Sequence, residues 1–462
     1  MREQDKLSDA KRVLFDRYLQ GKIVSKSNIQ RRSRTTAPLS FVQEQLYIRE
    51  QELQGKPAIY NECIRMRVRG SIDSNVLERS FNEILRRHEV WRTSFETKAG
   101  QPVQVIHPAS PIEFTKIDLR GLNETDREAE ALRLVSKCAR LPFQLGNDCL
   151  LRPILVRTSE QEHCLFLVAH QIVLDGRSAY QIYPYELASH YKTFLRGQKS
   201  SLPELPIQCA DFAWWQRDWW TDHNSAQFDY WRHQLAGPLP DPGWPIGERN
   251  TGAQPFIGRI RPFAFTTQLS NEIRDLTKRL NTTLFLVLLT AVAVVIHRHM
   301  TGSALIVGTL SPSGRKRSEV TNLLGYFLNP VPLRFDFHDH RTFRELLSRS
   351  RHIVSEAMSN DDVPIEHVAQ SLGYTNRPGL TPFFNVVVSL QPPAEELDLP
   401  WSITSMDVES GGSPWPLYLA FIDRPQGIIG RMQWNPGLVE ISTLEHLINE
   451  LEETLRLVCS EL

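Results

Sequence analysis

The sequence lacks an excess of either charge, and this absence excludes several classes of protein. Its 53 lysine and arginine residues balance 53 aspartate and glutamate residues, so the formal net charge at pH 7 is zero. No block of like charge is long enough to form a charged tail, and we expect the short basic cluster RRSRTT (31–36) to be an exposed loop. Because nothing here attracts nucleic acid or an anionic membrane surface, we expect neither as a partner.

Cysteine pairs and long apolar runs are also missing. The six cysteines are scattered without a Cys-x-x-Cys pair, which argues against a metal site or a disulfide framework. The charged N-terminus MREQDKLSDAKRVLF lacks the apolar stretch of a signal peptide, so we expect a reduced, cytoplasmic setting. The most apolar run, LFLVLLTAVAVVI (284–296), is shorter than the roughly 18–20 residues of a membrane span. It follows Thr282 and Thr283, which are typical helix caps, and therefore predicts a helix buried in the core.

What is present is a chain long and apolar enough for two lobes. It has 462 residues, of which 41% are hydrophobic, whereas a single domain usually has roughly 100–200 residues. Helical and strand-like segments alternate without an internal repeat, which predicts a mixed α/β fold. We expect a leader helix (8–22) and linker within 1–38, an N-terminal lobe over 39–197, an inter-lobe crossing containing Pro and Ser over 198–208, and a C-terminal lobe over 209–462.

Local patterns predict the individual elements. Strands are expected where polar and apolar residues alternate or where a short apolar run ends, and helices where apolar residues recur at three- and four-residue spacing. The expected strands are 62–70, 163–170, 304–310 and 383–391; the expected helices are 74–88, 178–197, 210–220, 284–296 and 443–458; a Pro- and Gly-rich loop is expected at 236–247.

One heptapeptide, HQIVLDG (170–176), follows the apolar strand 163–170 and can carry chemistry. A strand that ends in this way can present polar side chains into a cleft. The alternative interpretation is a strand that leaves the core through a turn at Asp175 and Gly176, which are common turn residues. The heptapeptide alone does not separate the two interpretations.

Five segments in a fixed order give this heptapeptide its context. They are LSFVQEQLYI (39–48), RHEVWRTSF (87–95), HQIVLDG (170–176), GTLSPSGR (308–315) and GYFLNP (325–330), accompanied by ADFAWWQ (210–216), NDDVPIEHV (360–368) and FFNVVVSLQ (383–391). Together they resemble the condensation domains of nonribosomal peptide synthetases, within the larger group of acyltransferases shaped like chloramphenicol acetyltransferase. The resemblance covers almost the whole chain.

The resemblance implies two chloramphenicol acetyltransferase-like α/β lobes in a V with a central tunnel. It also implies that donor and acceptor carrier proteins dock at the two mouths and extend phosphopantetheine arms inward. In the family motif His-His-x-x-x-Asp-Gly, the second His is a base or positioning group near the acceptor amine, the first His is structural, and the Asp pairs with an Arg of the second lobe. At these positions the chain has Gln171, His170, Asp175 and Arg315, and Asn329 stands at its usual place.

Only the second His of the motif is changed, and a shift of register does not restore it. His170 lies five residues before Asp175 rather than four, so we expect His170 to point away from the tunnel and Gln171 to face the substrates. A glutamine amide forms hydrogen bonds but does not titrate near neutral pH. The imidazole that it replaces typically contributes 10²–10⁴-fold as a general base.

Amide formation does not depend on that base in the way that ester formation does. An α-amino group has a pKa of roughly 7.7–8.0 and is partly unprotonated at neutral pH, unlike an alcohol. Holding two tethered reactants in contact contributes roughly 7–11 kcal/mol. We expect Gln171 to orient the amine, while Gly176 and the helix that follows it offer backbone N–H groups to the developing oxyanion.

Several supporting residues have two interpretations. Arg92 either fixes a helix-to-strand turn or acts near the tunnel, and Asn385, on a strand expected to face the cleft, either contacts substrate or only supports the strand. Asp211 and Trp214 are expected to pack the junction of the lobes. Arg315 is expected to hold the loop and the lobes together through Asp175.

Two functions therefore stay open. The first is an acyltransferase that joins a carrier-bound acyl or peptidyl thioester to a carrier-bound amino acid, in nonribosomal peptide or hybrid polyketide–peptide biosynthesis. The second is a catalytically silent platform on which carrier domains or a tailoring enzyme dock. In both cases the partners are carriers and other synthetase or polyketide synthase modules, and we expect no metal or cofactor bound by the chain itself.

Overall fold

A computed structural model of the chain describes most of its length. The described residues are 29–52, 57–147, 149–223, 225–240, 256–300, 302–338, 342–374, 383–403 and 408–462. The expected leader helix (8–22) and most of the expected loop at 236–247 lie outside these ranges.

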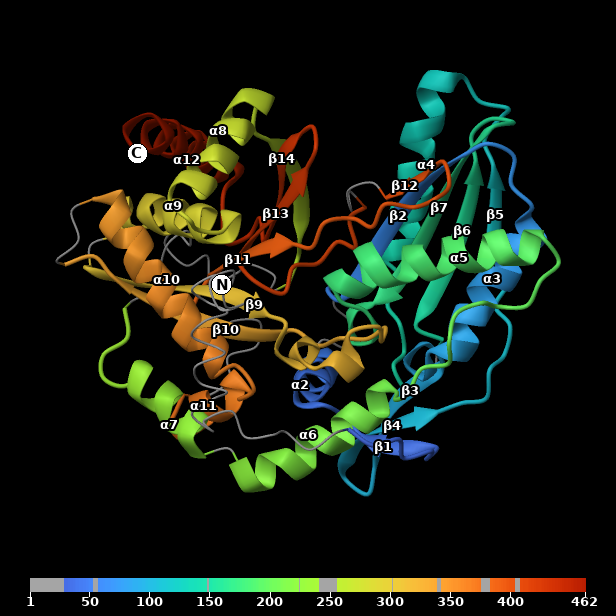
Figure 1. Cartoon of the computed structure of the whole chain (residues 1–462), viewed down its shortest axis with the longest axis horizontal. Helices are drawn as coiled ribbons and strands as arrows, with labels where there is room; N and C mark the ends of the chain where they lie inside the picture. The colour runs from blue at the N-terminus through green and yellow to red at the C-terminus, as the bar shows by residue number, and fades with distance from the viewer. Residues whose placement is uncertain are drawn as a thin grey trace, which may run out of the picture.

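The first lobe is built on a five-stranded sheet (Figure 1). Its strands in spatial order are β12 (Trp401–Ile403), β2 (Asn61–Arg69), β7 (Glu162–His170), β6 (Leu151–Arg157) and β5 (Thr115–Asp118). The helix α4 (Glu124–Ala139) covers the face of β2 that carries Asn61 and Arg65, because Asn61 donates to the Ala139 carbonyl and Arg65 pairs with Glu128. The helices α3 (Ser74–Arg87) and α5 (Tyr183–Leu195) pack on each other at the other face.

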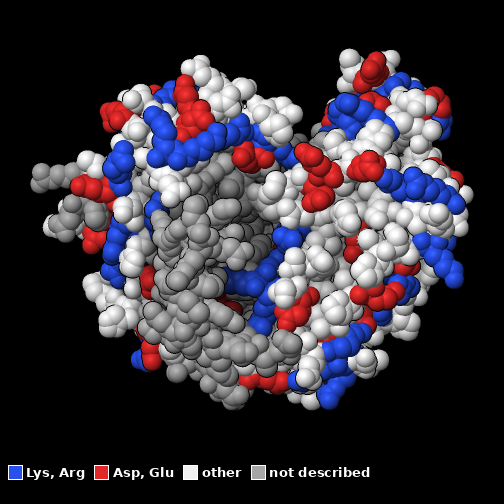
Figure 2. Space-filling view, viewed as in Figure 1, with Lys and Arg blue, Asp and Glu red and all other residues white. Residues whose placement is uncertain are grey.

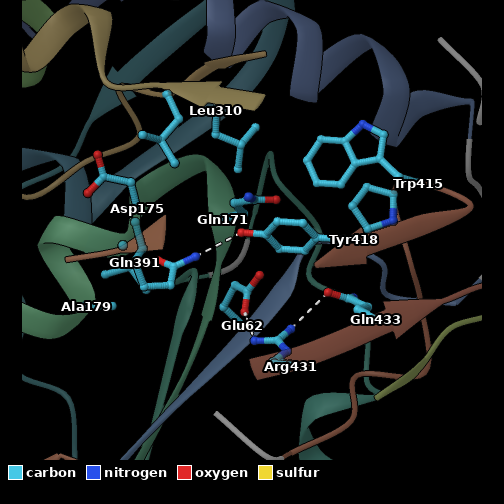
Figure 3. Close-up of a pocket in the computed structure, with 14 residues that line it drawn as sticks. Glu62, Gln171, Asp175, Ala179, Leu310, Gln391, Trp415, Tyr418, Arg431 and Gln433 are labelled. Carbon is cyan, nitrogen blue, oxygen red and sulfur yellow. Dashed lines mark hydrogen bonds and ion pairs between the residues drawn. The ribbon is translucent and has the colours of Figure 1, made fainter. Parts of the chain in front are cut away.

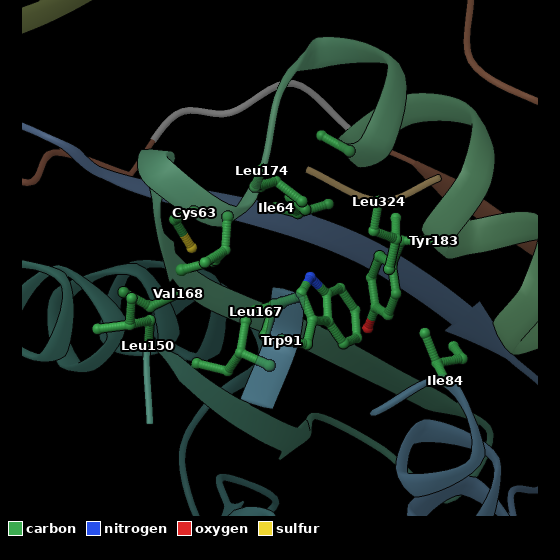
Figure 4. Packing of buried hydrophobic residues seen from close by; sticks show 14 of the residues in the cluster. Cys63, Ile64, Ile84, Trp91, Leu150, Leu167, Val168, Leu174, Tyr183 and Leu324 are labelled. Atoms are coloured by element: carbon green, nitrogen blue, oxygen red, sulfur yellow. The ribbon is translucent and has the colours of Figure 1, made fainter. Parts of the chain in front are cut away.

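Aromatic side chains fill the core between the sheet and the helices α3 and α5 (Figure 4). Trp91 is buried with its ring 5.4 Å from Phe81 and 5.5 Å from Tyr183, measured between ring centroids. Leu174, from the loop after β7, is buried in the same cluster, so the heptapeptide is anchored in the core on one side.

A small three-stranded sheet corrects the expectation that a linker runs to Pro38. The strand β1 (Thr36–Pro38) pairs with β4 (Gln101–Ile106), which pairs with β3 (Thr93–Lys98). The preceding residues are also held: Arg31 pairs with Glu89 at 2.6 Å and with Asp211 at 3.0 Å. The basic cluster at 31–36 is a largely exposed loop up to the start of β1, as expected, and carboxylates hold part of it in place.

The second lobe is built on a six-stranded mixed sheet covered by helices. Its strands in spatial order are β10 (Asn329–Asp336), β9 (Ala304–Ser311), β11 (Val386–Gln391), β13 (Leu417–Arg424), β14 (Gly427–Trp434) and β8 (Arg259–Ala264). The helices are α8 (Thr267–Arg279), α9 (Leu284–Arg298), α10 (Phe343–Ser359), α11 (Ile365–Ser371) and α12 (Ile441–Glu461).

The apolar helix expected at 284–296 is α9, and most of it is buried. Thr283 caps it by accepting a hydrogen bond from the Leu286 N–H, and α9 packs against α8, α10 and α12. Within the described residues no single helix is long and apolar enough to cross a membrane; only α8 and α9 taken together, with a bend of 109° between them, meet the requirement of length and composition.

The lobes exchange segments, which the expected division at 198–208 does not capture. That crossing has no helix or strand and joins α5 to α6 (Cys209–His223), which is followed by α7 (Ser225–Gln234). Further along the chain, β12 adds to the first lobe's sheet by pairing with β2, and Trp401 is buried in the first lobe's core. The cores of the two lobes therefore do not follow one cut in the sequence.

Charged side chains of both signs are interspersed over the described surface in Figure 2, in keeping with the zero net charge.

Candidate active site

The heptapeptide lies where β7 ends beside β2. The strands are antiparallel, with Asn61 opposite His170 and Glu62 opposite Ala169, and the Gln171 N–H donates to the Tyr60 carbonyl at 2.7 Å. The chain then makes one 3₁₀ turn, η3 (Gln171–Val173). Because successive strand residues point to opposite faces, His170 and Gln171 leave the strand end in different directions.

His170 is buried in the first lobe and faces away from the cleft. Its Nδ1 atom accepts a hydrogen bond from the Ile172 N–H at 3.1 Å, and its ring packs edge-on against Tyr60 and Phe143. Its Nε2 atom lies 3.8 Å from a Glu50 carboxylate oxygen. This imidazole therefore holds the loop in shape.

Gln171 lines a narrow pocket of about 50 Å³ between the lobes (Figure 3). Within the part of the chain that the structure describes, no hydrogen-bond partner binds its side-chain amide, which is therefore available to a substrate. Helix α2 (Phe41–Gln51) contacts the loop through its first turn. Ser40 and Gln43 form a capping box there, and Gln43 also donates to the Ile172 carbonyl at 3.4 Å.

Asp175 and Arg315 form a bidentate ion pair across the lobes. The Arg315 Nε and Nη2 atoms each donate to Asp175 at 2.7 Å, and the Arg315 and Asp175 side chains are 5% and 0% exposed, respectively. Asp175 also accepts the Ser178 N–H at 2.9 Å, and Arg315 also donates to the Leu323 carbonyl at 3.0 Å. The expected pairing of Asp175 with Arg315 is present and fixes the loop that carries Gln171.

Gly176 lies close to the second lobe. A Cβ atom at this position would lie 2.6 Å from the Gln391 Oε1 atom. Gln391, at the end of β11, donates to the Tyr418 hydroxyl at 2.9 Å and separates the Gln171 pocket from a second pocket of about 350 Å³. Both pockets are lined by Gly176, Leu310, Leu328 and Gln391.

A charged group in the Gln171 pocket was not predicted from the sequence. Glu62, from β2, lies 3.8 Å from the Arg431 Nη1 atom, and Arg431 Nη2 donates to Gln433 at 2.9 Å. Burial raises the pKa of Glu62, and the positive charge of Arg431 opposes this shift. The alternation of ECIRMRVRG is the only sequence signal for Glu62, and it does not show which residues meet it from β14.

Arg92 and Asn329 take supporting positions outside the residues that line the two pockets. Arg92 donates to the His107 carbonyl and pairs with Glu89 at 3.6 Å, so it fixes the turn between η2 (Glu89–Arg92) and β3. Asn329 is buried and donates to the Asp361 and Val363 carbonyls, both at 2.8 Å.

Asn385 lies immediately before a strand, and its expected role in substrate contact stays a prediction. It does not belong to a strand over 383–391, because β11 begins one residue later at Val386, and Asn385 does not line either of the two pockets. Asn385 is buried, and its carbonyl accepts the Leu417 N–H at the end of the strand remote from Gln391.

Asp211 and Trp214 pack α6 against the segment before β1. Asp211 accepts the Arg32 backbone N–H at 2.7 Å and the Gln208 N–H at 2.8 Å. The guanidinium groups of Arg32 and Arg34 lie 5.3 and 5.2 Å from the Trp214 ring. These are structural contacts, and they do not reach the Gln171 pocket.

No group of three His, Cys, Asp or Glu side chains in the described ranges is arranged to hold a metal ion. The functional groups that the geometry offers are hydrogen-bonding amides, one loosely paired carboxylate and the backbone at the start of a helix. Such a set can position an amine and a carbonyl group.

The comparisons with known proteins agree with the motifs. The family model of the condensation domain matches residues 33–460. One of the proteins that make up linear gramicidin synthase in Brevibacillus parabrevis is 35% identical over 427 residues, which are 90% of this chain and 8% of that protein. The chain thus spans less than a tenth of that relative.

Solved structures share the fold at lower identity. The complex of the X-domain and OxyB from teicoplanin biosynthesis matches with a TM-score of 0.79 and 23% identity, over 95% of this chain and 96% of that one. The first condensation domain of the calcium-dependent antibiotic synthetase, in complex with a substrate analogue, matches with a TM-score of 0.79 and 18% identity, over 93% and 98%. The expected α/β fold class of the chloramphenicol acetyltransferase type is confirmed, and the chain belongs to the condensation domain family.

Proposed function

We propose that the chain is an acyltransferase that joins a carrier-bound acyl or peptidyl thioester to a carrier-bound amino acid. The observation that carries this proposal is the Gln171 pocket between the lobes, whose loop is fixed by the buried pair of Asp175 and Arg315. The similarity to linear gramicidin synthase supports a place in nonribosomal or hybrid peptide synthesis, with carrier domains and other modules as partners. A cytoplasmic location remains a prediction.

The proposed reaction is aminolysis of a thioester. The amine nitrogen of the acceptor attacks the carbonyl carbon of the donor, a C–N bond forms, the C–S bond breaks, and the phosphopantetheine sulfur leaves as a thiol. The Gln171 amide orients the amine by hydrogen bonding. Gly176 and Arg177 line the second pocket just before η4 (Ser178–Ile182), and their backbone N–H groups, at the positive end of the helix, are the proposed donors to the oxyanion.

Phosphopantetheine supplies the thioester and a flexible tether, and this chain supplies the enclosure. Placement of two tethered reactants contributes roughly 7–11 kcal/mol, which exceeds the contribution of a general base. The chain can therefore favour amide formation with a glutamine at position 171.

A docking platform is the second candidate function. The observation that favours it is the similarity to the X-domain, which was solved in complex with OxyB, together with the small volume of the Gln171 pocket. A docking platform does not need a pocket whose loop is fixed in place, whereas an acyltransferase requires one to position its two substrates.

Intact-protein mass spectrometry of the carriers separates the two functions. A donor carrier loaded with an acyl group and an acceptor carrier loaded with an amino acid are mixed with and without the chain. The acyltransferase adds the acyl mass to the acceptor carrier and returns the donor to its free thiol. Carriers that react with a partner condensation enzyme but remain unchanged with this chain would favour the platform.

A further inference from the structure

Gln171 cannot carry out one step of the reaction, which is removal of a proton from the attacking nitrogen. After the C–N bond forms, the nitrogen carries a positive charge, and the amine leaves again unless it loses a proton. A glutamine amide cannot accept that proton near neutral pH. The question is whether another described group in the pocket can accept it, and the answer rests on the proposed acyltransferase function.

Among the described residues that line the Gln171 pocket, four have ionisable side chains: Glu62, Asp175, Tyr418 and Arg431. Asp175 is engaged by two Arg315 donors and the Ser178 N–H. Burial raises the pKa of Tyr418, so its hydroxyl keeps its proton at neutral pH. Arg431 stays a cation. Glu62 is the group that remains.

The register of the sheet brings Glu62 to the substrate side of the loop. Glu62 lies opposite Ala169, two residues before Gln171, and both Glu62 and Gln171 line the same pocket. Figure 3 shows the Glu62 carboxylate beside Arg431, with Gln171 and Tyr418 on its other side. The Glu62 side chain is 23% exposed, which leaves it open to the pocket.

The Glu62 carboxyl group is loosely held. The nearest Arg431 nitrogen is 3.8 Å away, which is beyond hydrogen-bonding distance, and no described residue donates a hydrogen bond to Glu62. The charges and titratable groups around it are Arg431 from β14, Tyr418 from β13, Tyr180 from η4 and Cys63 beside it on β2. Burial makes Glu62 a stronger base than an exposed carboxylate, because it raises the pKa of the group.

We propose that Glu62 accepts the proton from the attacking amine nitrogen in place of the imidazole that this chain lacks. As the C–N bond forms, the carbonyl electron pair moves to oxygen, and the nitrogen then passes a proton to the Glu62 carboxylate. When the oxyanion collapses, the C–S bond breaks, and the departing thiolate takes the same proton from Glu62. The carboxylate is restored, and no further reactant is needed.

The first test replaces the carboxylate with its uncharged isostere. Glu62→Gln should lower the rate of amide formation in single turnover by about 10²-fold or more at pH 8, the range of a lost general base. The ratio of parent rate to variant rate should shrink toward one as the pH falls through the raised pKa of Glu62, because protonation removes the base from the parent as well. Glu162→Gln, at the opposite, exposed end of β7, is the matched control and should retain the parent rate.

A second substitution separates a lost base from a damaged pocket. Gln171→His introduced into Glu62→Gln supplies an imidazole in the same pocket and should recover at least tenfold of the loss. The recovered activity should fall at acid pH near the ordinary imidazole pKa of roughly 6.5.

The outcomes decide between the two layers of the proposal. An active parent with Glu62→Gln within threefold of it overturns the role of Glu62 and leaves the acyltransferase function standing. The same holds if Glu62→Gln is slow at every pH by a constant factor and Gln171→His recovers nothing, since that is the signature of a structural role. A parent that forms no amide with competent carriers overturns both.

Discussion

The buried pair of Asp175 and Arg315 fixes the loop that carries Gln171. Two charges in a site that is almost closed to water are tolerable only while they neutralise each other. Asp175→Ala leaves the Arg315 guanidinium unpaired, and Arg315→Ala leaves an unpaired carboxylate that is 0% exposed. The pair therefore joins the two lobes and fixes the loop that carries Gln171.

We predict that either alanine variant loses about 3–5 kcal/mol of the free energy of unfolding. Urea denaturation at pH 7 measures the change. Arg133→Ala removes an exposed pair with Glu130 on α4 and is a control that should change stability by less than about 0.5 kcal/mol. Parent-like stability together with full activity in both variants would contradict the role of the pair.

Gln171→His should be tolerated by the fold, because the two side chains have similar volumes and the position faces a pocket. Amide formation should stay within about tenfold of the parent, since placement contributes most of the rate. Ester formation from a hydroxy acceptor should rise by up to about 10²–10⁴-fold, because an alcohol requires a stronger base than a carboxylate such as Glu62. Mass spectrometry of both products checks this prediction, and an unchanged ester rate would count against it.

At the scale of residues, the motif predicted some contacts and missed others for a physical reason. The pairing of Asp175 with Arg315 was predictable because a known motif carries both residues. Glu62 and Arg431 were not, since they lie on strands of different lobes and no local pattern shows that the strands meet. The strand expected from residue 383 begins at Val386, because an apolar pattern does not fix the residue at which pairing begins.

In the helix that follows the loop, a single proline changes the hydrogen bonding of the first turns. The sequence predicted one helix over 178–197, but the chain makes a π-helical turn, η4, before α5. Pro184 has no N–H to donate to the Tyr180 carbonyl, which instead accepts the Glu395 N–H, from the segment between β11 and β12, at 2.9 Å. The carbonyl that the proline leaves without a helical donor thus binds the segment that leads to β12.

Ser178, in the same turn, forms a second set of contacts between the lobes. Its fully buried hydroxyl accepts the Gly325 N–H and donates to the Gly325 carbonyl, both at 3.1 Å, and it accepts from Arg315 at 2.8 Å. Ser178→Ala should cost about 1–3 kcal/mol, because it leaves buried polar groups without partners. Thermal and urea unfolding test this, with the exposed Ser355→Ala on α10 as the control. A loss of unfolding free energy no larger than that of the control would show that the Ser178 hydrogen bonds do not contribute to stability.

At the scale of the whole molecule, the order of motifs predicted the fold better than it predicted the borders of its parts. Alternating helices and strands, together with family motifs in sequence order, were enough for two α/β lobes. The exchange of β12 into the first lobe's sheet was not predictable, because three residues with one polar position indicate a strand but not its partner. The exchange and the pair of Asp175 and Arg315 tie the lobes on either side of the pocket.

The central claim is that this enclosure makes amides by placement, with no imidazole facing the substrates. Single-turnover mass spectrometry of one acceptor carrier, loaded either with an amino acid or with the matched hydroxy acid, tests it most directly. The account predicts that the amide forms and that the ester forms at least about 10²-fold more slowly, because the alcohol lacks a sufficient base. Comparable rates for the two acceptors, or no amide from carriers that a partner enzyme accepts, would contradict it.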